Sequence, residues 1–207
     1  MMYRFSFLAL LVLLCSCVSL GQTPSATKVA IVPVLNLSGE TWEEAKVKQA
    51  DRGDEELSAL FRERSFQVID PAKVKAAVAD LKIDLTDEEQ QKRETLYQIG
   101  EAVEADLVVF VVITDVDQRK VTKFLVSSTE GKAKMKAWLL NVKEKKPVFS
   151  AKTFEGASKS GGLFEVGEKG SHRKQLAVAN GIRKLFVDEY LKPYPVTEKI
   201  ERSKVGR

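Results

Sequence analysis

Residues 107–113 read LVVFVVI, seven consecutive apolar side chains near the middle of the chain. Since neighbouring side chains of a strand point to opposite faces, a run without polar residues is typical of a strand that is covered on both sides. We therefore predict that Asp106 to Val116 contains the central strand of a sheet. Phe110, the largest side chain of the run, is expected in the core.

The chain before this run alternates between strand and helix patterns. Residues 28–36 form a nearly continuous apolar segment, which predicts a second buried strand. Residues 41–64 carry apolar side chains at helical spacing, with an interruption expected at Gly53. A short alternating strand is predicted over residues 65–70, and Pro71 is suited to the first turn of the helix that follows.

A third helix is predicted directly before the central strand. Thr86 and Glu89 have the spacing of a capping box. In this motif the Thr86 side chain accepts a hydrogen bond from the backbone amide of Glu89, and the Glu89 side chain accepts one from the backbone amide of Thr86. The helix is expected to run to about Ala105. Gly100 lies on its apolar side, where glycine has a cost of about 1 kcal/mol relative to Ala. This cost suggests a close approach between helix and sheet.

The chain after the run reads as an antiparallel meander followed by a last helix. Strands are predicted at 121–128, 132–142 and 147–156, with turns at 129–131 and 143–146. A Gly-rich loop over 157–170 leads to a helix that Ser171 caps and that ends near Leu191. This order of elements predicts an α/β fold with a mixed sheet, in which parallel βα units are followed by an antiparallel meander and helices cover both faces.

The beginning of the chain has the features of a secretory signal peptide. Residues 1–21 contain one charge, Arg4, then an apolar run from Phe5 to Leu14 and small residues. The segment Leu14-Cys15-Ser16-Cys17 resembles the lipobox of bacterial lipoproteins, which implies a lipid on Cys17 and cleavage ahead of it. The alternative is ordinary cleavage after Gly21. By the sorting rule of such lipoproteins, Val18 implies an outer-membrane anchor; without the lipid, the chain would be a soluble periplasmic protein.

Charge and cysteine content exclude several classes of function. Residues 23–191 hold equal numbers of acidic and basic side chains, so the net charge of +4 belongs to the two ends. A nucleic-acid binder generally has a basic body, and we therefore expect no nucleic-acid partner. Both cysteines lie in the signal segment and the chain has a single histidine, His172. We expect no disulfide, no metal site, no cofactor and no catalytic residue in the body.

The predicted domain organisation follows from these patterns. A short linker over residues 22–27 joins the signal segment to one α/β domain over residues 28–191. Residues 192–207 are rich in charge and poor in apolar side chains, which predicts a basic, flexible tail.

The order and spacing of these segments resemble the domain shared by CsgG-like lipoproteins and the amino-terminal domain of TolB. The resemblance covers residues 28–190 and departs from the family pattern at Val34, where the family has an aromatic residue, and at Asn141, where it has Asp. It is carried by VAIVPVLNLSGE (29–40), SFQVID (65–70), the segment from Ile99 to Val109, and residues 137–142 and 147–150.

The resemblance implies a fold similar to the TolB amino-terminal, anticodon-binding-domain-like architecture. The family contains an export channel, a partner of the Tol–Pal system and activators of peptidoglycan synthases. It therefore implies a non-enzymatic cell-envelope lipoprotein that acts as an interaction or assembly module for envelope proteins that the sequence does not identify. The alternative is a soluble periplasmic domain that binds a small anionic ligand or an envelope polymer. The sequence leaves open whether the chain forms a homo-oligomer.

A cluster of basic residues at the start of the last helix predicts an anion site. Ser171 begins the helix, Lys169 precedes it, and His172, Arg173 and Lys174 occupy its first turn. Each cation near the positive end of the helix dipole destabilises the helix by roughly 0.3–1 kcal/mol. The arrangement is understandable if the helix start and these side chains together hold a phosphate or carboxylate.

Three further groups of residues are candidate sites. Asp115 and Asp117 lie two apart near the end of a strand, where carboxylates could bind Ca²⁺ or act as acid and base, but solvated carboxylates are the simpler interpretation. Asn36, Ser38 and Gly39 follow the first strand at a position where open α/β sheets bind ligands, although turn residues would explain them equally well. Residues 156–162, GASKSGG, lack the lysine of a phosphate-binding loop.

Overall fold

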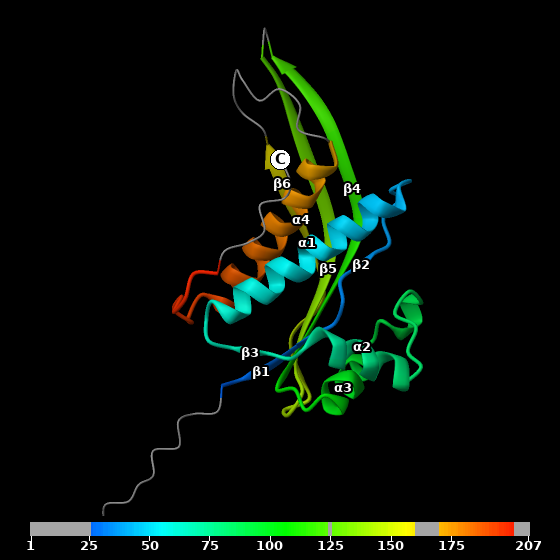
Figure 1. Cartoon of the computed structure of the whole chain (residues 1–207), viewed down its shortest axis with the longest axis vertical. Helices are drawn as coiled ribbons and strands as arrows, with labels where there is room; N and C mark the ends of the chain where they lie inside the picture. Colours follow the sequence, from blue (N-terminus) through cyan, green and yellow to red (C-terminus); the bar gives the residue numbers. More distant parts are fainter. Residues whose placement is uncertain (1–25, 124–125, 160–169, 201–207) are drawn as a thin grey trace, which may run out of the picture.

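The fold is built on a mixed sheet, shown in Figure 1. The computed structural model describes residues 26–123, 126–159 and 170–200 of the 207-residue chain. The strand order is β3-β1-β4-β5-β6, and β2 also pairs with β4. The strands are β1 (Lys28–Ile31), β2 (Leu35–Asn36), β3 (Gln67–Val68), β4 (Leu107–Lys123), β5 (Val126–Asn141) and β6 (Lys146–Lys159). Strand β1 pairs in parallel with β3 and with β4, and β2 pairs in parallel with β4. Strands β4, β5 and β6 form an antiparallel meander.

Helices cover both faces of this sheet, as predicted. They are α1 (Glu43–Arg62), α2 (Pro71–Asp80), α3 (Arg93–Ala102) and α4 (Gly170–Phe186), with the π-helical turn η2 (Val187–Leu191) after α4. Side chains of α1 and α4 pack in one apolar cluster on one face, and those of α2 and α3 pack in a second cluster on the other face. The sheet therefore separates two cores (Figure 1).

The seven-residue apolar run is the centre of both cores, which confirms the predicted central strand. Val109, Val111 and Ile113 lie in the cluster of α1 and α4. Val108, Phe110 and Val112 alternate with them and lie in the cluster of α2 and α3. Phe110 has no exposed surface, and its ring lies 5.2 Å from the ring centre of Trp138.

The predicted turn at residues 129–131 is wrong. Strand β4 continues to Lys123, β5 begins at Val126, and Gly131 pairs with Gln118 within the ladder. The physical reason is the contact between Gly131 and α4: a Cβ atom on Gly131 would lie 2.3 Å from the carbonyl oxygen of Arg173. The glycine permits the backbone of a helix to approach the sheet, and it is not a turn residue.

The same kind of contact explains why the Gly-rich loop begins later than predicted. Residues 157–159 belong to β6, so GASKSGG starts inside a strand. A Cβ atom on Gly156 would lie 1.9 Å from the carbonyl oxygen of Ala177 and 2.9 Å from the Cα atom of Gly181. Gly131, Gly156 and Gly181 together let α4 lie backbone against backbone on β5 and β6.

Two further glycines are packing contacts. The predicted interruption of the helix at Gly53 is wrong, since α1 runs through it. A Cβ atom there would lie 3.2 Å from the side chain of Val34 and 3.3 Å from that of Ile182. The predicted close approach at Gly100 is confirmed, because a Cβ atom would lie 2.4 Å from the Val108 side chain.

The capping box predicted at Thr86 and Glu89 is also wrong. The Thr86 hydroxyl donates to Oδ1 of Asp84 at 2.6 Å, and Asp87 accepts the amide of Glu89 at 2.9 Å. These contacts hold a single 3₁₀ turn, η1 (Glu88–Gln90), and α3 begins only after it. Asp side chains that bond to nearby amides compete with helix formation, and here two of them replace the predicted first turns.

Strand β6 is an outer strand of the described sheet, and its outer side is irregular. A bulge places Ser150 and Ala151 opposite Trp138, and Ala151 has φ of 50°. Pro147 stands near the beginning of the strand. Further along, the Asn180 side-chain amide of α4 donates to the carbonyl oxygen of Ala157 at 3.0 Å.

The first residues of the predicted tail pack on the domain. The amide of Thr197 donates to the carbonyl oxygen of Glu63 at 2.8 Å, and the hydroxyls of Thr197 and Ser65 lie 2.7 Å apart. The ring of Tyr194 lies 4.9 Å from that of Phe66. These contacts tie residues 194–197 to the end of α1. The signal segment and residues 201–207 lie outside the described residues.

We predict that Phe110→Ala lowers the free energy of unfolding by about 3–5 kcal/mol, because it removes a fully buried ring from the core. Val148→Ala is the control, since Val148 is 44% exposed and its truncation should cost far less. Urea unfolding of both variants measures the difference. Equal losses for the two variants would show that Phe110 does not contribute to the core as described.

A second prediction concerns the contact between α4 and the sheet. Gly156→Ala should lower the free energy of unfolding by about 3 kcal/mol, because the new methyl group forces α4 away from β6. Gly39→Ala is the matched control, because a Cβ atom on Gly39 meets nothing within 4 Å. Thermal melts of the two variants should differ clearly, and matching melting temperatures would contradict the close contact.

Candidate functional site

A patch of charged side chains covers the sheet face opposite α4. A bulge between Ile113 and Asp115 shifts the register of β4 against β5, so the residues beyond it continue the face of Phe110 and Val112 with polar side chains. Glu130 is half-buried and the other seven are exposed. We call this patch the charged sheet face; its residues are Asp115, Asp117, Arg119, Glu130, Lys132, Lys134, Glu155 and Lys159.

The register of the three strands arranges these charges in rows. The first row is Asp115, Lys134 and Glu155, the second is Asp117, Lys132 and the uncharged Ala157, and the third is Arg119, Glu130 and Lys159. Residues directly opposite each other on neighbouring strands have Cβ atoms about 4.5–5.5 Å apart. Every charged side chain of the face therefore has a neighbour of opposite sign across the ladder.

The third row contains an ion pair. The Lys159 ammonium lies 2.9 Å from Oε1 of Glu130. This hydrogen bond, with weaker attraction from Arg119 and Lys132, lowers the pKa of the Glu130 carboxyl. The carboxylate is thus held in its charged form.

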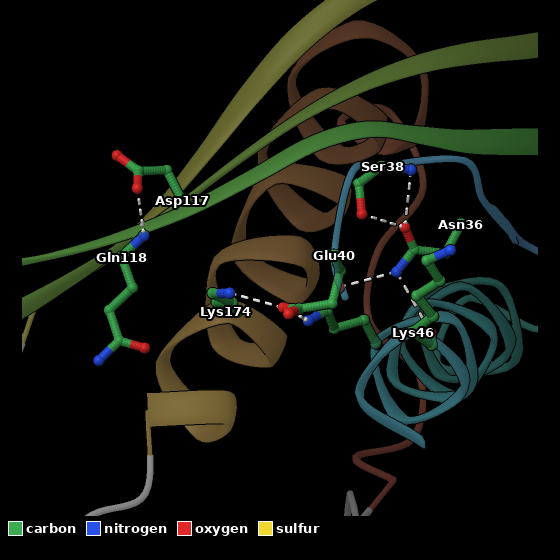
Figure 2. Close-up of polar contacts among 8 residues, drawn as sticks. Asn36, Ser38, Glu40, Lys46, Asp117, Gln118 and Lys174 are labelled. Atoms are coloured by element: carbon green, nitrogen blue, oxygen red, sulfur yellow. Dashed lines mark hydrogen bonds and ion pairs between the residues drawn. The ribbon is translucent and has the colours of Figure 1, made fainter. Parts of the chain in front are cut away.

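The first two rows form a shallow hollow of about 290 Å³ in this face, lined mainly by charged side chains: Asp115, Asp117, Arg119, Lys132, Lys134 and Glu155. Within the described residues, no ion pair joins these six side chains to one another. Oδ1 of Asp117 accepts the amide of the next residue, Gln118, at 2.7 Å (Figure 2). The hollow therefore presents both signs of charge to solvent.

The Asp115 and Asp117 pair of the sequence analysis belongs to this face. The residues described here contain no group of three or more His, Cys, Asp or Glu side chains that could hold a metal ion. The lysines of the neighbouring strand lie beside the two carboxylates in register. The arrangement can bind a surface of mixed charge.

A second polar cluster lies at the carboxyl end of β2. The Asn36 side-chain amide donates to Oε1 of Gln49 at 2.7 Å, and its Oδ1 accepts from the amide and hydroxyl of Ser38 at 3.1 Å and 2.6 Å. Oε2 of Glu40 accepts from Lys174 at 2.5 Å and from Gln49 at 3.4 Å. Figure 2 shows these contacts joining β2, α1 and α4. The polar groups of this cluster bond to one another, which makes it a connection between elements.

The structure describes four of the five predicted anion-site residues, Ser171, His172, Arg173 and Lys174, at the beginning of α4. Lys174 forms the ion pair with Glu40, which lowers the pKa of that carboxyl. Arg173 is 7% exposed, and its carbonyl oxygen lies over Gly131. Ser171 lies within α4, which the structure describes from Gly170. Lys169 is outside the described residues, so the anion site as a whole stays a prediction. Cys17, the predicted lipid site, is likewise outside them.

A half-buried carboxyl that the sequence patterns do not indicate belongs to Asp54 of α1. Oδ1 of Asp54 accepts the amide of Val34 at 3.0 Å and so ties α1 to the segment between β1 and β2. Burial raises the pKa of Asp54 from 3.8 to about 6. No sequence signal marks it, because one Asp in a helix rich in charge looks like any solvated residue.

We predict that Asp54 makes the stability depend on pH. Since its pKa is higher in the folded protein than in the unfolded chain, folding favours the protonated form. That contribution is complete below about pH 3.8 and is lost as the pH rises through about 6. Asp54→Asn keeps the acceptor without the charge, and should raise the free energy of unfolding at pH 8 by up to about 3 kcal/mol.

The gain in the free energy of unfolding from Asp54→Asn should disappear toward pH 4. Urea unfolding across the pH range measures it. Asp80→Asn, an exposed position at the end of α2, is the control and should have a much flatter effect. A gain from Asp54→Asn that is the same at pH 4 and pH 8 would refute the assignment.

Comparisons with known proteins find matches among solved structures. No protein-family model matches the chain, and no curated protein does. Among solved structures, the lipoprotein GNA1162 from Neisseria meningitidis is 14% identical, with a TM-score of 0.47 over 78% of this chain and 99% of that one. The hypothetical protein CT253 from Chlamydia trachomatis is 13% identical, with a TM-score of 0.47 over 82% and 96%. A minor lipoprotein from Acinetobacter baumannii is 6% identical, with a TM-score of 0.39 over 82% of this chain and 96% of that one.

Two of these three structural neighbours are bacterial lipoproteins. In the described part of the chain, no helix has the length and apolar content needed to cross a membrane.

Proposed function

We propose that the chain is a non-enzymatic lipoprotein of the bacterial cell envelope that acts as an interaction or assembly module, with the charged sheet face as its contact surface. The observation that carries the proposal is the face itself: eight charged side chains on three paired strands, with α4 packed against the other side. A surface braced in this way keeps its shape when a partner binds, which limits the entropy lost on association.

The contacts of the second polar cluster favour this role over the binding of a small anion. Lys174 already has Glu40 as its partner, and Asn36 and Ser38 bond to each other. The charged sheet face, in contrast, has exposed groups of both signs around an open hollow. Charges of this kind act mainly by selecting a complementary partner and steering it into place.

The lipid anchor on Cys17 would leave this face accessible. Only about ten residues separate Cys17 from Lys28, which is at most about 36 Å of extended chain. Val29 pairs with Leu107 at the beginning of β4. Asp115 lies eight residues further along β4, roughly 27 Å from Leu107. In Figure 1 the start of β1 and the far end of β4 lie at opposite ends of the molecule. The charged rows therefore lie away from the anchored end.

The proposal is tested first at the anchor. Metabolic labelling with a clickable palmitate should mark the wild-type chain and miss Cys17→Ala, because the thioether needs the Cys17 sulfur. Cys15→Ala is the matched control and should keep the label. Equal labelling of the wild type and Cys17→Ala, or a mature chain that begins at Gln22, would contradict the lipoprotein assignment.

The contact surface is tested in the same cells. A photo-crosslinking amino acid at Asp117 should capture an envelope protein, whereas the same probe at Lys184, an exposed position on α4, should capture much less. Mass spectrometry identifies the captured chain. Equal capture at both positions would remove the charged sheet face from the proposed function.

A further inference from the structure

We infer that the charged sheet face is also a docking surface for a second copy of the same chain, packed face to face about a two-fold axis. This inference does not depend on a lipid anchor or on another envelope protein. It rests on the register of β4, β5 and β6, which places each charge of the face in a known row.

The first and third rows are opposite in sign at every position. Across β4, β5 and β6, the first row reads acidic, basic, acidic with Asp115, Lys134 and Glu155. The third row reads basic, acidic, basic with Arg119, Glu130 and Lys159. A surface that carries a pattern and its complement, separated by one row, can recognise itself.

A two-fold axis parallel to the rows and above the middle one brings the complements together. Successive rows are about 7 Å apart, since each is two residues further along a strand. Rotation about this axis lays the first row of one copy on the third row of the other. Asp115 then faces Arg119 of the second copy, Lys134 faces Glu130, and Glu155 faces Lys159. Because the interface is symmetric, each of these contacts occurs twice.

The hollow makes room for the longer side chains. It lies around the first two rows, where Asp115 and Glu155 have short or medium side chains at its edges. The long side chains of Arg119 and Lys159 from the second copy can reach into it. The middle row meets itself, so Asp117 faces Asp117 and Lys132 faces Lys132 of the second copy. Each of these like-charged pairs lies beside the other pair, which has the opposite sign, so the net charge of the row is zero.

The free protein keeps few ion pairs that would have to break. Lys159 and Glu130 form one, and the Lys159 side chain is 63% exposed. An ion pair with a largely exposed lysine is weak, because water competes with it, so exchanging it for intermolecular pairs is not costly. The other six charged groups have no such pair among the described residues, and four of them, Asp115, Arg119, Lys134 and Glu155, gain a partner of opposite sign in the dimer. Their attraction is screened by salt, and the interface should retain bridging water.

The test is sedimentation velocity of the chain with Cys17→Ala, so that no lipid contributes to association. At about 0.02 M NaCl the protein should form dimers, and at about 0.5 M it should dissociate with a Kd at least about tenfold higher. A chain that stays monomeric at low salt, or a dimer whose Kd does not change with salt, would overturn the inference.

Charge reversal identifies the surface. Lys134→Glu places two acidic groups opposite each other twice in the dimer, and Glu130→Lys does the same with two basic groups. Each should raise the Kd about tenfold or more. The double variant with both changes restores opposite charges across the interface and should recover the wild-type Kd to within about threefold.

Lys184→Glu, on α4, is the control and should leave the Kd unchanged. Circular dichroism melts confirm that each variant is folded. The salt dependence of the Kd is measured on a chain whose charged sheet face is unchanged, so it remains a test even if a charge-reversal variant fails to fold. A double variant as weak as the single ones, or single variants that dimerise like the control, would overturn the inference. Neither result affects the palmitate labelling that tests the proposed function.

Discussion

The backbone of α4 lies directly on the backbones of β5 and β6, and the rest of the architecture depends on this contact. It is possible only because Gly131, Gly156 and Gly181 have no side chains at the points of closest approach. The contact fixes which face of the meander is covered, since a helix at this distance leaves space for neither water nor a second layer. On the other face of the same strands, the residues beyond the bulge in β4 are exposed and form the charged rows.

The bulge in β4 completes this division. Up to Val112, the side chains on the far face are apolar and pack under α2 and α3. Beyond the register shift at Ile113 and Asp115, the same face is charged. One irregular residue pair thus marks the border between a buried half of the sheet and an open half. The open half carries the exposed side chains of the charged sheet face, and the buried half packs under α2 and α3.

Much of the fold could be predicted from the sequence, because hydrophobic patterning is a strong signal for elements buried on both sides. LVVFVVI predicted the central strand and its double burial, and Pro71 marked a helix start that the structure has. Glycine was the main source of error. Gly53 and Gly131 were interpreted as breaks, whereas both are positions where another element comes close. A single sequence contains no information that separates these two uses of glycine.

The candidate site was predictable only in part. Asp115 and Asp117 could be recognised as a pair on one face of a strand. Their neighbours Lys134 and Lys132 could not be assigned to them, because the predicted hairpin had the wrong turn and therefore the wrong register. Asp54 was missed because its raised pKa arises from burial between elements that are distant in sequence. Local patterns predict elements, whereas a site built across strands requires the exact pairing.

Strand β6 has a consequence for how chains can join. An outer strand with regular, unpaired backbone groups would invite a second chain to extend the sheet, and through it open-ended aggregation. Here Pro147 lacks an amide proton, the bulge at Ala151 breaks the row of hydrogen-bonding groups, and Asn180 occupies the carbonyl oxygen of Ala157. Growth by continuous strand pairing is therefore blocked along much of this edge. A second copy that docks as inferred above contacts a face of the sheet, where the two-fold symmetry closes the assembly at two copies.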